Sequence, residues 1–463
     1  MATLTIALPR LELVHPSYTA DQPDLQTLLS VLYEPLLRWE NGHVAPAAIA
    51  SWTAQDEGRR WELVLRDELR FTDGSACTAH DVRAAILALR DADGPFGMGG
   101  VYAQYLHEFE LVVTSPTRLT LASEHFAADY FDLFPAIYLS KPDPNGGKPL
   151  GTTGYRLEEY VPRQHLIVSR TEPSPASEVT SVTFIEVGSV DERLNLLKSH
   201  RCDIATGLEE LPKRRLTDAG VSTREVPNTL SVTMLLNGFR GPFSDQRARI
   251  ALNHAIDVNE LIDTVWPDRA IPAHTVVSPY HYGFSTGLER LAFDPDRALR
   301  LFQQAEVRVP IRFRAPMETP DRAPEIGRNL VDQLARLGVP AELELEPDRP
   351  KYAREVSEKR IADGAIFDSS PLSTFRILVE KVRSDPPGLW WQGVRDMEAD
   401  RLIAAARASP TGPQRLSAYQ SCLRHLSVAP PWLYLFHPIK VMGLRHTALP
   451  ASLSHAGVLV LEP

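Results

Sequence analysis

Two adjacent tryptophans and two isolated charged residues are the side chains of this sequence best suited to hold a small molecule. Trp390 and Trp391 stand in a loop before a helix predicted over 396–408, and neighbouring indole rings cannot easily both point into one core. We expect one of them to line a binding site, the alternative being packing in the core or on the surface. Asp368 is expected to accept from an ammonium or hydroxyl group, unless it caps the next turn. Arg383 is expected to hold a carboxylate through two hydrogen bonds, unless it is a solvated surface residue.

Three tyrosines are further candidates for stacking on a ligand. Tyr282 belongs to the stretch Tyr280-His281-Tyr282, which lies in a loop flanked by proline and glycine. Tyr102 and Tyr105 are the candidates in the N-terminal part of the chain. These tyrosines, the two tryptophans, the aspartate and the arginine make up the expected set of ligand contacts.

The motifs of catalysis and metal binding do not occur in this sequence. Its 14 histidines are scattered, without an HExxH pair or another paired-ligand spacing. Neither a G-x-S-x-G elbow, a P-loop nor a G-x-G-x-x-G turn is present. We therefore expect no catalytic residue, no metal site made by the protein and no cofactor, which is the pattern of a binding protein rather than an enzyme.

Length and composition describe an ordinary globular chain with more than one core. The 463 residues exceed what one hydrophobic core usually spans, so two or three subdomains are expected. Hydrophobic residues make up 43% and charged residues 23%, with a formal net charge of −10. Since a nucleic-acid partner calls for a basic patch, this acidic balance argues against one.

The cysteines and the N-terminus bear on the compartment of the protein. Cys77, Cys202 and Cys422 are far apart and form no CxxC pair, so three buried free thiols are expected, the alternative being one disulfide and a free thiol. The sequence has no apolar stretch near the ~18 residues that a membrane helix needs. Residues 1–10 lack the basic and apolar regions of a secretory signal. Either a leader was removed, or Met1 is the native start and the protein stays in the cytosol.

Strands and helices alternate along the chain, which predicts an α/β fold. Thr78 is the expected N-cap of one helix, with Asp81 in its first turn. A single helix is predicted after Ser244, because apolar residues recur with helical spacing from Ile250 to Ile262. The other predicted strands are 3–8, 61–66, 119–121, 165–170, 181–185, 311–314 and 341–345, and the other predicted helices are 191–199, 324–337, 396–408 and 413–426.

Two apolar strands, near 229–237 and 430–436, are predicted to cross between two lobes, and two crossings are what a hinged protein needs. We place the hinge crossings at about 229–237 and 430–441. The expected domains are lobe one over 1–232 plus 440–463, with an inserted subdomain at about 45–150, and lobe two over 238–432.

Seven short segments, in this order over nearly the whole chain, resemble the signatures of one family. They are Tyr33-Glu34-Pro35-Leu36-Leu37; Ser51-Trp52 with Trp61-Glu62-Leu63; Phe71-Thr72-Asp73-Gly74 with Thr78-Ala79-His80-Asp81-Val82; Gly151-Thr152-Thr153-Gly154-Tyr155; Arg193-Leu194 with Cys202-Asp203-Ile204; Leu236-Asn237 with Pro242-Phe243-Ser244-Asp245 and Ala255-Ile256-Asp257; and Phe293-Asp294-Pro295 with Ala298. The sequence is similar to type-5 extracellular solute-binding proteins of ABC importers, the family of oligopeptide-, dipeptide- and nickel-binding proteins.

The resemblance implies a large class II periplasmic-binding-protein fold of two lobes, with an extra subdomain inserted in lobe one. Many members carry an aspartate before an Asp-Pro loop, where it pairs with a peptide α-ammonium. In this sequence Asp368 lies one residue out of register with Pro371. The resemblance therefore does not establish that the solute is a peptide. The 151–155 segment also lacks the proline of the family pattern.

The resemblance also implies a function and partners. The expected protein is a monomer that captures a short peptide, an opine-like conjugate or a metal chelate by hinge closure. It hands the solute to an ABC permease and its ATPase. The expected location is periplasmic or extracytoplasmic if a leader was removed, and cytoplasmic if Met1 is native. The alternative function is a cytosolic sensor or enzyme on the same fold.

Overall fold

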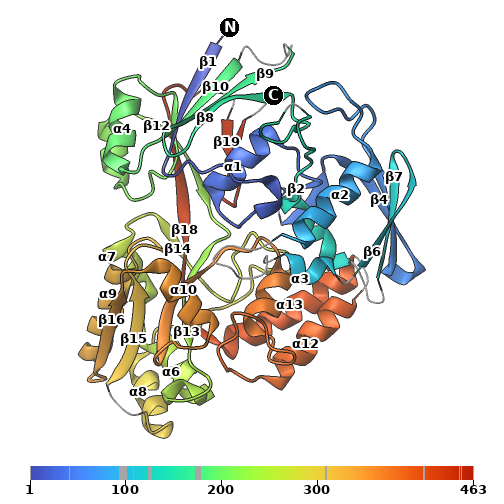
Figure 1. The fold of residues 1–463 in the computed structure, drawn as a ribbon. Helices are drawn as coiled ribbons and strands as arrows, with labels where there is room; N and C mark the ends of the chain where they lie inside the picture. Colours follow the sequence, from blue (N-terminus) through green and yellow to red (C-terminus); the bar gives the residue numbers. More distant parts are fainter. Residues whose placement is uncertain are drawn as a thin grey trace. The chain divides into compact units, whose positions relative to one another are not determined.

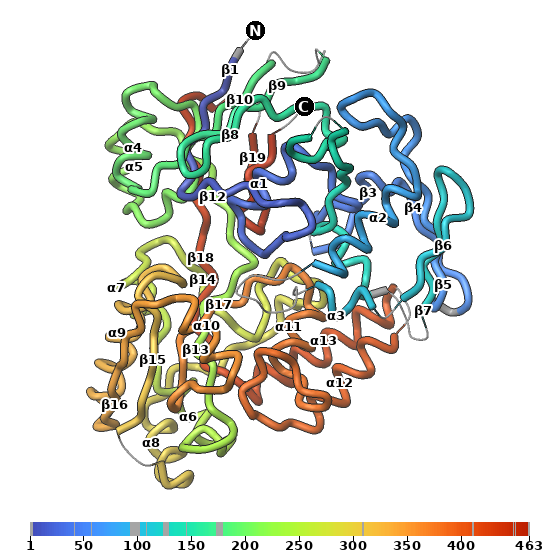
Figure 2. Tube along the Cα trace, viewed as in Figure 1, coloured from blue at the N-terminus to red at the C-terminus, as the bar shows by residue number. Residues whose placement is uncertain are grey.

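The computed structural model describes residues 2–40, 42–92, 102–107, 109–123, 128–144, 146–172, 179–307, 310–409, 412–447, 449 and 451–461. The chain divides into two compact units. Unit 1 comprises Met1–Val226 and Lys440–Pro463, and unit 2 comprises Pro227–Ile439. Figure 1 labels their helices and strands, and Figure 2 traces the chain from unit 1 into unit 2 and back along the red strand β18 (Trp432–Leu444).

The main sheet of unit 1 is mixed, and both of its faces are covered. Its strands are β1 (Ala2–Leu8), β8 (Tyr155–Val161), β9 (His165–Arg170), β10 (Val179–Glu186), β11 (Ile204–Ala205), β12 (Ser222–Pro227) and part of β18 (Trp432–Leu444). They follow the order β18-β11-β1-β10-β9-β8, with β1 parallel to β10 and β11, and β12 pairs with β18 off this path. Leu4, Ile6 and Leu8 enter one core and Ala7 the other, as alternation along a strand requires.

A second sheet of unit 1 is antiparallel, in the order β4-β5-β7-β6. These strands are β4 (Ile49–Gln55), β5 (Arg60–Leu65), β6 (Phe109–Ser115) and β7 (Arg118–Ser123). Among its described residues, unit 1 also contains two strand pairs: β2 (Leu37–Glu40) with β3 (His43–Pro46), and β19 (Ala451–Leu453) with β20 (Leu459–Leu461).

The helices of unit 1 are α1 (Pro23–Leu32), α2 (Ala79–Arg90), α3 (Ala103–Leu106), α4 (Val190–Lys198), α5 (Lys213–Asp218) and the 3-10 helices η1 (Pro16–Tyr18), η2 (Asp56–Gly58) and η4 (Ala128–Ala136). The predicted cap of α2 is confirmed. Asp81 Oδ2 accepts from the backbone N–H of Thr78 at 2.7 Å and from its hydroxyl at 2.8 Å.

Unit 2 is built on a sheet in the order β16-β15-β17-β13-β18. Its strands are β13 (Ser231–Leu236), β14 (Ala270–Pro272), β15 (Ile311–Pro316), β16 (Ala341–Glu346) and β17 (Gly364–Ser369), together with the first part of β18. β15 runs parallel to both β16 and β17, whereas β13 is antiparallel to β17 and β18.

The helices of unit 2 are α6 (Gln246–Ala255), α7 (Val258–Val265), α8 (Pro295–Gln304), α9 (Ala323–Arg336), α10 (Arg349–Ser357), α11 (Thr374–Ile377), α12 (Met397–Ala408), α13 (Pro413–Val428), the 3-10 helix η5 (Pro242–Ser244) and the π-helix η6 (Leu378–Val382). The prediction of one helix after Ser244 is wrong. The chain breaks at Asp257, whose carboxylate accepts from the N–H groups of Asn259 and Glu260 and so starts a second helix with the same apolar periodicity.

The α/β fold predicted from the sequence is confirmed. The segments near 229–237 and 430–441 are β13 and β18, and β18 pairs with β13 and β14 in unit 2 and with β11 in unit 1. Their role as hinges stays a prediction, as do the lobe and subdomain boundaries. The three cysteines are buried and unpaired, and burial raises the pKa of each thiol to about 12. Among the helices that the structure describes, none is long and apolar enough to cross a bilayer.

Candidate functional site

The sheet of unit 2 brings three strand ends to one edge. Because β15, β16 and β17 run in the same direction, their last residues Pro316, Glu346 and Ser369 lie at the same edge of the sheet. Helix α10 begins three residues after β16, so its first residue, Arg349, comes close to Asp368 near the end of β17. Open α/β sheets bind ligands outside the carboxyl ends of their strands. This edge is therefore the place in unit 2 where groups that hold a small molecule are expected.

Four side chains gather at this edge around the buried ring of Phe367. The guanidinium carbon of Arg349 lies 5.3 Å from the ring centre, and Lys381 Nζ lies 5.6 Å from it. The indole of Trp390 is tilted against the same ring at 5.2 Å between centroids. With Asp368 these residues form what we call the Phe367 cluster. An aromatic face attracts cations, so one ring can position both positive groups.

The Phe367 cluster holds two positive side chains and one carboxylate, a formal net charge of +1. Arg349 Nη2 lies 3.5 Å from Asp368 Oδ1, which is long for a charged hydrogen bond. Arg349 Nε is buried and donates to no acceptor among the described residues. Lys381 Nζ donates to the backbone carbonyl of Asp368 at 3.0 Å. Within the cluster, the Arg349 guanidinium therefore has donor capacity left over.

A π-helix and a tightly fitted loop hold Lys381 and Trp390 in place. Lys381 lies on η6, whose Glu380 pairs with Arg376 at 2.9 Å in a nearly fully buried ion pair. The backbone N–H of Trp390 donates to the backbone carbonyl of Glu380 at 2.9 Å. A Cβ added at Gly388 would meet the Val379 and Glu380 carbonyl oxygens at 2.2 and 2.3 Å, so glycine permits this contact. Single-turn π-helices occur frequently at functional sites.

His281 fastens a neighbouring loop to the segment that follows Asp368. Its Nδ1 accepts from the N–H of Ser278 at 3.1 Å, so the proton resides on Nε2, which donates to the Pro371 carbonyl at 2.8 Å. Burial lowers the pKa of His281 to about 4, and the ring is neutral at pH 7. A neutral, doubly bonded histidine keeps this loop fixed to the end of β17.

The structure brings only Asp368 and Trp390 of the predicted contacts together. Trp391 is buried, its indole N–H donates to the Val394 carbonyl at 2.7 Å, and its ring packs edge-on against Phe239 at 5.1 Å. Arg383 follows the π-helix, and its Nε donates to the Pro386 carbonyl at 3.1 Å.

The predicted tyrosines lie in other surroundings. Tyr282 packs against Tyr419 on α13, with Arg415 lying 4.6 Å from the centre of its ring. Tyr102 and Tyr105 are buried in unit 1, and the Tyr102 hydroxyl donates to Asp21 Oδ1 at 2.6 Å. Ligand contact by all of the predicted residues, Asp368 and Trp390 included, stays a prediction.

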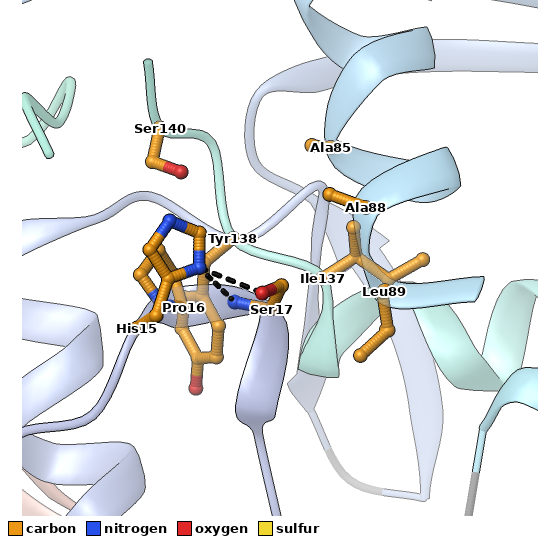
Figure 3. Close-up of a pocket in the computed structure, with 9 residues that line it drawn as sticks. All are labelled: His15, Pro16, Ser17, Ala85, Ala88, Leu89, Ile137, Tyr138 and Ser140. Atoms are coloured by element: carbon orange, nitrogen blue, oxygen red, sulfur yellow. Dashed lines mark hydrogen bonds between the residues drawn. The ribbon is translucent and has the colours of Figure 1, made fainter. Parts of the chain in front are cut away.

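Unit 1 contains a separate small pocket, which Figure 3 shows in close-up. It lies between η1, α2 and the segment after η4, with His15 Nδ1 at 2.6 Å from the Ser17 hydroxyl and Tyr138 behind them. Its cavity volume is about 10 Å³, far below the roughly 300–1,000 Å³ of typical ligand pockets. It contains none of the predicted contacts. Within the described ranges, no group of three or more His, Cys, Asp or Glu side chains is arranged to hold a metal ion.

Sequence reasoning missed Arg349, Phe367 and Lys381. Arg349 follows the strand predicted over 341–345, and the rule that ligands bind beyond strand ends could have identified it. Lys381 carried no such signal, because its position depends on the π-helix.

Comparisons with known proteins agree with the fold. The model of the family "Bacterial extracellular solute-binding proteins, family 5 Middle" matches residues 43–368, well over half of the chain. The nickel-binding periplasmic protein of Escherichia coli (strain K12) is 24% identical over 307 residues, which cover 62% of this chain and 57% of that protein. The probable di/tripeptide-binding protein 5 of Pseudomonas aeruginosa (strain UCBPP-PA14) is 22% identical over 439 residues, covering 86% and 82%.

Solved structures share the fold along the whole chain. NikA from Brucella suis in complex with Fe(III)-EDTA has a TM-score of 0.82 at 18% identity and covers 100% of both chains. The ABC transporter substrate-binding protein CtaP from Listeria monocytogenes has a TM-score of 0.84 at 16% identity, covering 100% of this chain and 99% of that one. The family expected from the sequence is thereby confirmed: this chain belongs to family 5 of the bacterial extracellular solute-binding proteins.

Proposed function

We propose that this protein is the solute-binding component of an ABC importer and that it holds its solute at the Phe367 cluster. The observation that supports this most is the cluster itself, where two cations and a tryptophan meet at the carboxyl edge of three parallel strands. Such an edge offers both halves of a small-molecule site, an aromatic wall and a few fixed charges.

The solute class follows from relatives of this fold. Their names and bound molecules include di- and tripeptides, a nickel-binding function, Fe(III)-EDTA and, for AgaA of Agrobacterium tumefaciens R10 (TM-score 0.78, 16% identity), agropinic acid. We propose a solute of this size and polarity: a short peptide, an opine-like conjugate or a metal chelate. Hinge closure, a monomeric state, an extracytoplasmic location and delivery to a permease with its ATPase belong to the same proposal.

The protein binds its solute without changing it. The Phe367 cluster includes no serine, threonine or cysteine, and the nearby histidine, His281, has both ring nitrogens engaged. A bound solute stabilises the folded protein by mass action, by about 2.7 kcal/mol at a concentration of 100 times Kd.

The test is retention of a small molecule. The protein is incubated with the low-molecular-mass fraction of a bacterial culture, freed of unbound solutes by gel filtration and denatured. The released compound is then compared with the same compound in the starting fraction by mass spectrometry. We expect one compound, or one class, at unchanged mass. Retention of nothing contradicts solute binding, and a changed mass contradicts a role limited to binding.

A further inference from the structure

The charges of the Phe367 cluster favour a negative group on the solute. Arg349 and Lys381 both lie within 6 Å of the same ring centre, whereas Asp368 supplies one carboxylate. The Arg349 side chain is 22% exposed and can be approached from solvent. Its buried Nε lacks an acceptor among the described residues, and an unsatisfied charged donor is costly. An oxyanion that reaches the exposed part of this guanidinium would accept charge-assisted hydrogen bonds there.

Asp368 is poorly suited to the ammonium group that its sequence position suggests. Its Oδ1 already faces Arg349, and its backbone carbonyl accepts from Lys381. An ammonium that approached this carboxylate would come close to two positive side chains and be repelled by both. The same carboxylate can instead keep the guanidinium oriented through Nη2.

We infer that Arg349 binds a carboxylate of the solute and that Asp368 is the positioning residue that orients Arg349. This inference rests on the proposed function. A planar guanidinium can bind a carboxylate with two parallel hydrogen bonds, whereas a lysine acts as a point charge. Trp390 stands against the same ring and supplies the apolar wall for the rest of the solute. The site therefore selects solutes by an acidic group, and a free amine contributes nothing to binding there.

The experiment uses chemically blocked forms of one solute mixture. The low-molecular-mass fraction of a bacterial culture is tested untreated, after acetylation of its amines and after methyl esterification of its carboxylates. The melting temperature of the full chain is measured over a dilution series of each, with inorganic phosphate as a separate probe. We expect the untreated and acetylated fractions to raise the melting temperature, and the esterified fraction and phosphate to leave it unchanged.

Variants assign the effect to residues. Arg349→Gln should require at least about ten times more of the untreated fraction for half of the shift, because it loses charge-assisted hydrogen bonds. Arg349→Lys should recover part of that loss, since it restores charge but not the fork. Arg354→Gln is the matched control: it removes the same charge from an exposed position on the same helix and should match the parent protein. Asp368→Asn should change binding of the untreated and acetylated fractions by the same factor.

Three outcomes overturn the inference. A shift that survives esterification but is lost on acetylation means that the solute is held by its amine. A shift produced by phosphate and insensitive to esterification means a different oxyanion. A loss in Asp368→Asn confined to the untreated fraction means that Asp368 binds an ammonium. In these cases solute binding itself stands, whereas the absence of a shift with every fraction overturns the proposed function as well.

Discussion

Two arginines of unit 2 differ in how many of their guanidinium donors have acceptors. Arg314, on β15, donates to Glu355 at 2.8 Å, to Glu344 at 3.2 Å and to the Arg360 carbonyl at 3.0 Å, with its side chain 9% exposed. Arg349 has one carboxylate at 3.5 Å and a buried Nε without an acceptor in the described structure. An arginine that stabilises the fold therefore differs from one suited to bind a ligand mainly in how many of its guanidinium donors already have acceptors, and less in how deeply it is buried.

The largest effect is expected from breaking the saturated arginine. Arg314→Met leaves the mostly buried carboxylate of Glu355 without its cation, whereas Glu346 keeps Lys351 as a partner. The loss at Glu355 should lower the free energy of unfolding by about 3–5 kcal/mol. Urea denaturation measures this, and calorimetry on the folded fraction should show unchanged solute binding. A loss below about 1 kcal/mol would show that Arg314 is not structural.

The two tryptophans should differ in the same way, Trp391 contributing to stability and Trp390 to solute binding. Trp391→Ala removes a buried ring whose N–H is bonded inside unit 2, so we expect a loss of about 3–5 kcal/mol in the free energy of unfolding. Trp390→Ala should instead weaken solute binding by about 2 kcal/mol. Denaturation measures the change in the free energy of unfolding of each variant, and calorimetry measures the change in its free energy of solute binding. Equal effects of the two substitutions on binding would remove the distinction.

Low pH should destabilise the protein by protonating His281, whose loop is bonded to the segment after β17. Burial lowers the folded-state pKa of His281 to about 4, below the unfolded value of 6.5, so folding favours the neutral ring. Its contribution is present above pH 6.5 and is lost as the pH falls from about 6.5 to about 4, amounting to about 3 kcal/mol. Denaturation between pH 4 and 7 measures the slope. In His281→Asn the slope should be smaller, and an identical slope would exclude His281 as its source.

The smallest effect is expected from Arg349 itself on stability. Its one carboxylate is distant and both side chains are partly exposed, at 22% and 17%. Arg349→Gln should therefore change the free energy of unfolding by less than about 1 kcal/mol, as for other weak ion pairs. A loss as large as that of Arg314→Met would mean that both arginines serve the fold.

The sequence predicted the framework well because local signals specify it. The cap at Thr78, the strands over 311–314 and 341–345 and the helix over 413–426 each follow from nearby residues, and the structure contains them as α2, β15, β16 and α13. The break at Asp257 was missed because the apolar period continues across it.

The candidate site was only half accessible from the sequence. Asp368 and Trp390 stood out by residue type, and the structure brings both to Phe367. The distances from Arg349 and Lys381 to the same ring depend on three strand ends meeting at one edge and on the π-helix turning Lys381 inward. These contacts join residues that are far apart in sequence, so no local pattern reports them.

A crystal structure of the solute-loaded protein tests the central claim most directly. We predict that a carboxylate oxygen of the solute lies about 3 Å from Arg349 Nε or Nη2. The solute should pack against Trp390, and Asp368 should remain beside the guanidinium. An ordered solute held elsewhere, with Arg349 facing only Asp368, would contradict it.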